Sequence, residues 1–311
     1  MMKDLLPFIL THEGISYIKD DALYILDRRK LPFERKYIVC KDYKEAAKAI
    51  SDMVTQGGGP LEVALNTFLL ESRRNSNLDD VVKTLSSSRK TNTTMKESLY
   101  HLLDCVRKGE DAEKAVSSLF SYYDECYDRM SSFGASLIKD GDGILTRCFA
   151  EHSFLLSVKK AVLSGKDVKV YVPETRPYLQ GARLTISSLT EMGIGAYLIT
   201  DAMMANLMNE KKITLYMTAS DRYLKNGSII NKTGTLADAI CASYFNIPYY
   251  AFALKRSSND DYEMEYRRGE EVKQIAGVRI APESCEALYP AFDFVDRTLI
   301  SAVITPEGIN E

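Results

Sequence analysis

Short apolar runs separated by polar breaks dominate the first 40 residues of the chain. Ile15–Ile18 and Ala22–Leu26 form two such runs, with three polar residues between them, and Tyr37–Cys40 forms a third. Apolar runs of this length, bounded by polar turn residues, are typical of strands joined by tight connections. The pattern therefore predicts a small antiparallel sheet in the N-terminal part of the chain.

The apolar residues change to a helical spacing after residue 41. Asp42 followed by Glu45 is a pattern that caps the start of a helix, and apolar residues at helical spacing come next. This spacing continues to about residue 125, with breaks at Gly57–Pro60 and near residues 86–92. We expect an N-terminal domain, residues 1–130, that joins the small sheet to a bundle of helices.

The second half of the chain alternates between two patterns. Strand-like runs lie at Gly143–Thr146, Val168–Val172, Ala196–Ile199, Ile213–Met217 and Tyr249–Leu254. Helix-like runs lie between them, at Ser153–Leu163, Arg183–Met192, Met203–Met208 and Leu236–Phe245. Apolar strands that alternate with helices predict an α/β domain in which a parallel sheet is covered by helices on both faces. We expect this domain to comprise residues 131–311.

Composition and charge exclude several classes of protein. The chain has 311 residues, of which 45% are hydrophobic and 27% charged, with a net charge of −3. These values are typical of a globular protein and argue against a dedicated nucleic-acid binder. No apolar run approaches the length of about 20 residues needed to cross a bilayer, and the first residues lack the pattern of a signal peptide. We therefore expect a cytoplasmic protein without membrane contacts.

Cysteine and histidine spacing does not favour a metal site. The six cysteines form no C-x-x-C pair, and there are three histidines. Cys148 differs from the others because it lies between a predicted strand and a predicted helix. A helix N-terminus favours a thiolate, with Arg147 and His152 as neighbours that could tune it. The alternative interpretation is a small core residue, which is the commoner role of a lone cysteine.

Polar clusters follow three consecutive predicted strands. They are Glu174–Arg176, Thr200-Asp201 and the segment Asp221–Lys232, which ends in Asn231-Lys232 before a helix. Open α/β sheets bind ligands outside the carboxyl ends of their strands. Asp221 could move a proton there, and Asn231 and Lys232 could hold a polar or anionic substrate. A single cluster could be a helix cap, but three together favour a site.

Two further segments could bind an anion. Gln56-Gly57-Gly58 is a glycine-rich turn before a helix, where backbone N–H groups are exposed, or else a tight interhelical turn. Arg89-Lys90-Thr91 precedes a helix that is predicted to open with a capping box at Thr94–Glu97. Cations at a helix start oppose the helix dipole, so an anion between them and the helix would stabilise them. The alternative is a solvated basic loop.

These motifs, in this order, resemble the methylthioribose-1-phosphate isomerase family across nearly the whole chain. The most specific are ETRPYLQGARLT (Glu174–Thr185), LITD (Leu198–Asp201) and Asp221–Thr235. The family is related to the α, β and δ subunits of translation initiation factor 2B and to ribose-1,5-bisphosphate isomerases. The resemblance implies an N-terminal sheet-plus-helix domain and a Rossmann-like C-terminal domain in a homodimer.

The same resemblance implies an activity and a set of site residues. The family converts 5-methylthioribose 1-phosphate, a phosphorylated pentose, into 5-methylthioribulose 1-phosphate in methionine salvage, without a metal or organic cofactor. Cys148 matches its catalytic thiol and Asp221 its catalytic acid/base. Substrate contacts are implied at Gln56, Gly57, Gly58, Arg89, Gln180, Asn231 and Lys232.

Two departures from the family pattern leave alternatives open. The usual Arg-Gly-Ala of the family is Gln56-Gly57-Gly58 here, and a charge-assisted hydrogen bond of about 1.5–3 kcal/mol is lost with the arginine. The residue before Cys148 is Arg147 instead of histidine. One alternative is therefore a non-catalytic, ligand-binding regulatory paralogue that resembles the initiation-factor subunits. The other is an isomerase for a different ribose 1-phosphate derivative, such as ribose 1,5-bisphosphate.

Overall fold

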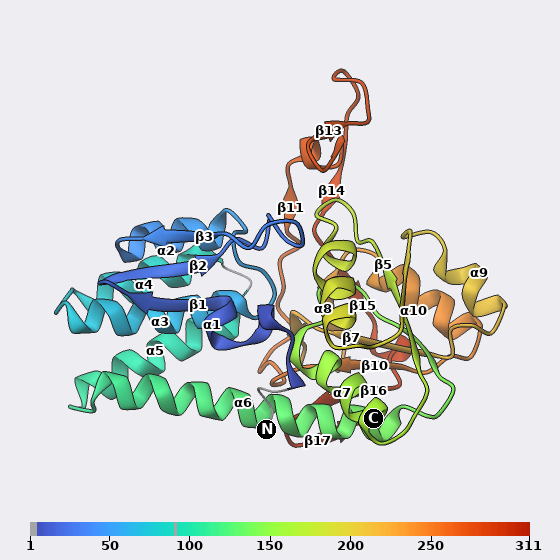
Figure 1. Cartoon of the computed structure of the whole chain (residues 1–311), viewed down its shortest axis with the longest axis horizontal. Coiled ribbons are helices and arrows are strands. Elements are labelled where there is room, and N and C mark those ends of the chain that lie inside the picture. Colours follow the sequence, from blue (N-terminus) through green and yellow to red (C-terminus); the bar gives the residue numbers. More distant parts are fainter. Residues whose placement is uncertain (1–4, 90–91) are drawn as a thin grey trace. The chain divides into compact units, whose positions relative to one another are not determined.

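The computed structural model describes residues 5–89 and 92–311 and divides into two compact units (Figure 1). The units are Met1–Glu125 and Cys126–Glu311. The division falls within the long helix α6 (Ala112–Leu137), as does the domain boundary expected from the sequence. Over the described ranges, no helix combines the length and the apolar character that crossing a bilayer requires.

The first unit opens with the expected antiparallel sheet. Strands β1 (Ser16–Lys19), β2 (Ala22–Leu26) and β3 (Tyr37–Cys40) lie in that order. Strands β2 and β3 have the predicted bounds, whereas β1 begins one residue late because Ile15 ends the short helix α1 (His12–Ile15). The sheet buries Leu23, Ile25 and Cys40 against the helices that follow.

Helices form the rest of the first unit. They are α2 (Tyr43–Ser51), α3 (Gly59–Arg73), α4 (Leu78–Ser88), α5 (Thr93–Arg107) and the N-terminal part of α6. Asp42 caps α2 as predicted, because its side chain accepts the N–H groups of Lys44 and Glu45 at 2.8 Å each. The capping box predicted at Thr94 is wrong: Asn92 caps α5 by accepting the Met95 N–H at 2.9 Å.

The second unit is built on a seven-stranded sheet with the order β17-β16-β10-β7-β4-β5-β6. All neighbouring pairs are parallel except β16 with β17. The strands are β4 (Gly143–Leu145), β5 (Lys169–Pro173), β6 (Ala196–Ile199), β7 (Leu215–Ala219), β10 (Tyr249–Phe252), β16 (Ala302–Thr305) and β17 (Gly308–Asn310). The chain moves outward from β4 through β5 to β6 and then resumes at β7 on the other side, which makes the β4–β7 pair the switch point of a doubly wound sheet.

Helices cover this sheet because its central strands are apolar on both faces. Every residue of β4 and β16 is buried, as are four of the five residues of β7. The helices are α7 (Glu151–Leu163), a π-helical turn at Gly181–Thr185, α8 (Ile186–Glu191), α9 (Met204–Asn209) and α10 (Thr235–Tyr244). Each predicted helix is present, and the α/β class with a parallel sheet is confirmed.

A second, smaller sheet was not expected from the sequence. Strand β9 (Ile229–Lys232) pairs antiparallel with β8 (Arg222–Tyr223) on one side and β15 (Phe292–Val295) on the other. Asn231 and Lys232 therefore end a strand instead of lying in a loop before α10. The pairing joins segments about sixty residues apart, which a local pattern cannot reveal.

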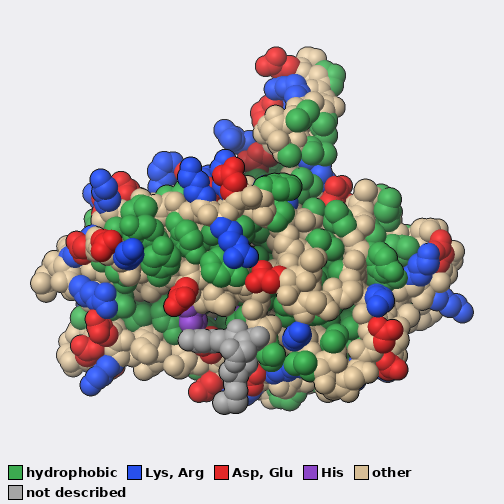
Figure 2. Space-filling model, viewed as in Figure 1, with side chains coloured by type: hydrophobic (Ala, Val, Ile, Leu, Met, Phe, Trp, Pro, Cys, Tyr) green, Lys and Arg blue, Asp and Glu red, His purple; other side chains and the backbone are tan. Residues whose placement is uncertain are grey.

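An arm projects from the second unit between β11 (Tyr266–Arg267) and β14 (Tyr289–Pro290), as the orange segment of Figure 1 shows. It carries a two-residue ladder of β12 (Gln274–Ile275) and β13 (Val278–Arg279). Figure 2 shows apolar and charged side chains side by side on its surface. At the base of the arm, the Tyr289 ring of β14 lies near the Lys232 ammonium.

Candidate active site

Cys148 and Asp221 lie at the switch point of the main sheet. Cys148 follows β4 and Asp221 follows β7, and these two strands are paired neighbours. Both residues therefore leave the carboxyl edge of the sheet where ligands of doubly wound folds bind. The Asp221 carboxylate and the Lys232 ammonium both act electrostatically on the Cys148 thiol. The structure thus brings together three of the residues that the sequence predicts for the site.

The surroundings of Cys148 favour the protonated thiol, contrary to the expectation of a thiolate. Burial raises its pKa to about 11, and the nearby Lys232 ammonium offsets only part of this effect. Helix α7 begins at Glu151, three residues further on, and the Cys148 N–H is donated to Thr175 Oγ1 at 3.1 Å. Because the loop separates the sulfur from the helix start, desolvation outweighs the dipole.

We expect Cys148 to react slowly with iodoacetamide, since the thiolate is the reacting form. With a pKa of about 11 the thiolate is a small fraction at pH 8, compared with about a quarter for a free cysteine of pKa about 8.5. Cys285 of the arm, which is partly exposed, is the internal reference. Peptide mapping by mass spectrometry should find Cys285 modified first, and equal rates at both positions would contradict the raised pKa.

The loops after β4 and β5 contain a cluster of strained backbone positions. Cys148, Glu151, Thr175 and Leu179 are non-glycine residues with φ values of 64°, 59°, 63° and 60°. Such left-handed conformations are uncommon outside glycine and are often found at functional sites. Two hydrogen bonds hold the Cys148 loop in place. The Cys148 N–H donates to Thr175 Oγ1 in the loop after β5, and Thr185 Oγ1 of the π-helical turn donates to the Cys148 carbonyl at 2.6 Å.

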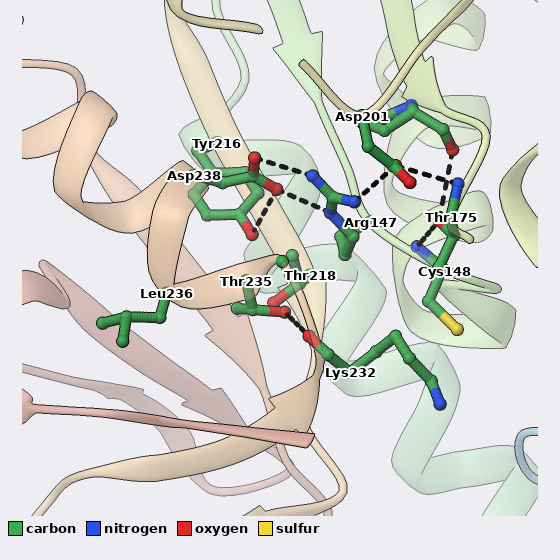
Figure 3. Close-up of polar contacts among 12 residues, drawn as sticks. Arg147, Cys148, Thr175, Asp201, Tyr216, Thr218, Lys232, Thr235, Leu236 and Asp238 are labelled. Atoms are coloured by element: carbon green, nitrogen blue, oxygen red, sulfur yellow. Dashed lines mark hydrogen bonds and ion pairs between the residues drawn. The ribbon is translucent and has the colours of Figure 1, made fainter. Parts of the chain in front are cut away.

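Arg147 is the centre of a buried ion network below these loops (Figure 3). Its Nε and one terminal nitrogen each donate to the Asp238 carboxylate at 2.8 Å, and the other terminal nitrogen donates to Asp201 at 2.6 Å. The Arg147 and Asp238 side chains are 2% and 0% exposed. Arg147 was expected to influence the Cys148 thiol. Its guanidinium instead forms ion pairs with the carboxylates of Asp238 and Asp201.

Asp201 connects this network to the loop after β5. Its carboxylate accepts the backbone N–H groups of Thr175 at 3.0 Å and Arg176 at 2.8 Å. Gly234 also lies against the network, and a Cβ atom there would be 2.6 Å from the Arg147 guanidinium.

Asp238 was missed by the sequence analysis, although a single acid in the otherwise apolar start of α10 was a usable signal. His152, the other proposed neighbour of Cys148, stacks on Tyr127 with ring centres 4.5 Å apart.

Lys232 is held in aromatic surroundings beside the Cys148 sulfur. Its side chain is buried, and its Nζ lies 5.0 Å from the centre of the Phe292 ring, 5.8 Å from Tyr178 and 5.9 Å from Tyr289. Figure 3 shows the ammonium and the sulfur on the same side, away from the Arg147 network. Cation–π contacts with these rings help to hold the ammonium in this position.

Asn231 and Gln180 lie in the same unit and are both buried. Asn231 Nδ2 donates to Thr235 Oγ1 at 3.1 Å, which places the amide at the start of α10. Gln180 immediately precedes the π-helical turn, a feature common at functional sites. The glycine at 181 allows this turn to approach β5, since a Cβ there would be 1.8 Å from the Pro173 carbonyl oxygen.

Asp221 is exposed to solvent, in contrast to the other members of the site. Its backbone N–H donates to the Ile230 carbonyl at 2.9 Å, which fixes the residue between β7 and β9.

The remaining predicted residues belong to the first unit. Gly57 has a φ of 62°, so the turn Gln56–Gly58 needs a glycine there. Gln56 is buried, and its Oε1 has no hydrogen-bond partner among residues 5–89 and 92–311. The guanidinium of Arg28, which the sequence analysis missed, donates to the Gln56 carbonyl and to the Ile9 carbonyl. Arg89 caps the end of α4 and is partly buried; Lys90 and Thr91 lie outside the described residues.

Metal ligands are not clustered in the described part of the chain. No group of three or more His, Cys, Asp or Glu side chains is placed there to hold an ion.

The fold and the site define a doubly wound α/β protein with a thiol, a carboxylate and an ammonium at its switch point. The family model of the initiation factor 2 subunit family matches residues 46–311. A methylthioribose-1-phosphate isomerase of Pseudothermotoga lettingae is 35% identical over 93% of this chain and 92% of that protein. The chain therefore belongs to the methylthioribose-1-phosphate isomerase family, within the initiation factor 2 subunit family.

Two solved structures are similar over most of their length. The 5-methylthioribose 1-phosphate isomerase of Pyrococcus horikoshii has a TM-score of 0.83 and 25% identity, covering 99% of this chain and 94% of that one. The δ subunit of translation initiation factor eIF-2B from A. fulgidus has a TM-score of 0.79 and 28% identity, covering 94% of each chain. The isomerases and the initiation-factor subunits, two of the three groups named in the sequence analysis, are thus represented among similar structures.

Proposed function

We propose that this protein converts 5-methylthioribose 1-phosphate into 5-methylthioribulose 1-phosphate, a step of methionine salvage. Its family makes it a sugar-phosphate isomerase. The observation that supports the specific reaction is the meeting of Cys148, Asp221 and Lys232 at the switch point of the sheet. Relatives that carry the name of this activity match the chain over most of its length.

The proposed chemistry follows from the raised pKa of the Cys148 thiol and from the place of the Asp221 carboxylate beside it. Opening the sugar ring requires a proton on the ring oxygen, and forming the C2 carbonyl releases the proton of the C2 hydroxyl while hydrogen moves from C2 to C1. A thiol with a pKa of about 11 is protonated at neutral pH, so we assign the donating role to Cys148. The exposed Asp221 then takes the proton from the substrate, and solvent returns it to the sulfur.

Substrate contacts are proposed for residues of the second unit and, separately, for residues of the first unit. Lys232, Asn231 and Gln180 would contact the sugar or its phosphate, because they are buried polar groups beside the thiol. Gln56, Gly57, Gly58 and Arg89 would form a second binding segment at the start of α3 and the end of α4. No cofactor takes part in this proposal. We further propose a cytoplasmic homodimer, and sedimentation of the purified protein as a monomer would contradict the dimer.

A side-by-side assay of two sugars tests the substrate. The purified protein is incubated with 5-methylthioribose 1-phosphate and with ribose 1,5-bisphosphate, and products are identified by mass spectrometry and NMR. We expect the ketose product from the first sugar at the higher kcat/KM. Preference for the bisphosphate would replace the proposed substrate while keeping the enzyme class.

A regulatory role is the second candidate function, because the eIF-2B subunit of A. fulgidus has a similar structure and Gln56 brings no charge to its loop. It predicts thermal stabilisation by a sugar phosphate with no product formed. Product formation in the assay above would exclude it.

A further inference from the structure

Tyr289 brings a hydroxyl group to the candidate site that the sequence analysis did not single out. The residue begins β14 at the base of the arm and is 3% exposed. Its hydroxyl oxygen is buried, with no hydrogen-bond partner in the described part of the chain. A buried hydroxyl that lacks a partner lowers stability, so its retention calls for an explanation such as a ligand that completes it.

Three neighbours place Tyr289 beside the reacting groups. The Lys232 ammonium lies 5.9 Å from the centre of its ring, and the ring meets that of Tyr178 edge-on at 6.0 Å. The Cys148 thiol also acts electrostatically on the Tyr289 hydroxyl. Thr233 holds β14 in this place, since its side chain and its N–H donate to the carbonyls of Pro290 and Ala291.

The chemistry of the group is that of a neutral donor. Burial raises the pKa of Tyr289 well above the ordinary value of a phenol, so the hydroxyl keeps its proton at neutral pH. The hydroxyl of Tyr178, by contrast, already bonds to Glu271 and Arg267. Of these two tyrosines that flank Lys232, Tyr289 is therefore the one whose hydroxyl is left for a ligand.

We propose that Tyr289 is a substrate-binding residue whose hydroxyl donates a hydrogen bond to the sugar oxygen next to the Cys148 thiol. The inference rests on the proposed isomerase function and adds a contact to it. Negative charge grows on the sugar oxygens as the ring opens and the C2 carbonyl forms, and a neutral donor placed there stabilises that charge. The contact should therefore lower the barrier as well as improve binding.

Tyr289→Phe tests this proposal, because it removes the oxygen and keeps the ring. Tyr249→Phe is the matched control: Tyr249 is also buried in this unit, but its hydroxyl is hydrogen-bonded to Thr218 Oγ1 at 2.7 Å. Each variant is compared with the wild type in three measurements: the Tm, the Kd for 5-methylthioribose 1-phosphate by calorimetry, and kcat/KM.

We expect opposite profiles for the two variants. Tyr289→Phe should keep or raise the Tm, since no protein hydrogen bond is lost, and should lower kcat/KM by about tenfold with a weaker Kd. Tyr249→Phe should lower the Tm and leave kcat/KM within about twofold of the wild type. Wild-type Kd and kcat/KM in Tyr289→Phe, or a Tm lowered as much as by Tyr249→Phe, would overturn the proposal.

The three measurements separate this inference from the proposed function. A wild type that binds the sugar phosphate but forms no product refutes the isomerase, and the Kd of Tyr289→Phe then decides the binding role. A wild type that neither binds nor converts the compound refutes both.

Discussion

Replacing Asp221 by asparagine should lower kcat for 5-methylthioribose 1-phosphate by about 10²–10⁴-fold. The amide has the size of the carboxylate but cannot accept the proton that leaves the substrate. Asp221 is exposed, and asparagine has the same shape, so most of the folding stability should be kept. Cys148→Ala should cause a loss of similar size by removing the donated proton.

The measurement is steady-state kinetics together with calorimetric binding of the substrate. A loss confined to kcat, with Kd changed by no more than a few-fold, identifies a group that acts in the chemical step. Asp261→Asn is the matched control, since Asp261 is an exposed aspartate in a loop of the same unit. Full activity of Asp221→Asn and Cys148→Ala would refute the assigned roles of these residues.

Asp238→Asn should destabilise the protein by about 3–5 kcal/mol, the usual cost of removing one partner of a buried ion pair. The change removes the charge opposite the Arg147 guanidinium, whose side chain is 2% exposed. Asp201 alone would then face that cation. Because Asp201 also holds the loop of Thr175, whose hydroxyl accepts the Cys148 N–H, activity should fall as well.

Chemical denaturation monitored by circular dichroism measures the loss. Glu210→Gln is the control, because the Glu210–Lys212 pair at 2.7 Å lies on the surface of the same unit and its removal should leave the midpoint unchanged. The double variant Arg147→Met, Asp238→Leu should recover much of the stability, since apolar residues of similar volume often replace a buried pair without loss. A midpoint for Asp238→Asn equal to that of the control would contradict this account.

The local parts of the fold could be predicted from the sequence. Strands β2, β3 and β6 have their predicted bounds, because a short apolar run can be recognised from neighbouring residues along the chain. Strand β7 was predicted to begin two residues too early. Ile213 is buried just before the strand, and its apolar character alone does not show that it lies outside the strand. Asn92 took the capping role expected of Thr94 because a helix start is chosen among several competing polar residues.

Part of the candidate site could be predicted for the same reason. The carboxyl ends of parallel strands meet at one edge of a sheet, so polar residues after β4 and β7 had to lie near each other once the parallel sheet was expected. The aromatic neighbours of Lys232 could not be predicted, because both come from distant parts of the chain. Phe292 pairs with Lys232 across two strands about sixty residues apart, and Tyr289 is held nearby by the bond of Thr233 to Pro290.

The sequence by itself determined the α/β class, the parallel sheet and the presence of Cys148 and Asp221 at its carboxyl edge. These follow from periodicity and strand direction, which are properties of short segments. Only the tertiary structure decided three further properties: the raised pKa of the Cys148 thiol, the carboxylates with which Arg147 pairs, and the burial of the Tyr289 hydroxyl without a hydrogen-bond partner in the described part of the chain. Each of these depends on burial and on partners far along the chain, and the desolvation of a thiol or the pairing of a guanidinium exists only after the elements have packed.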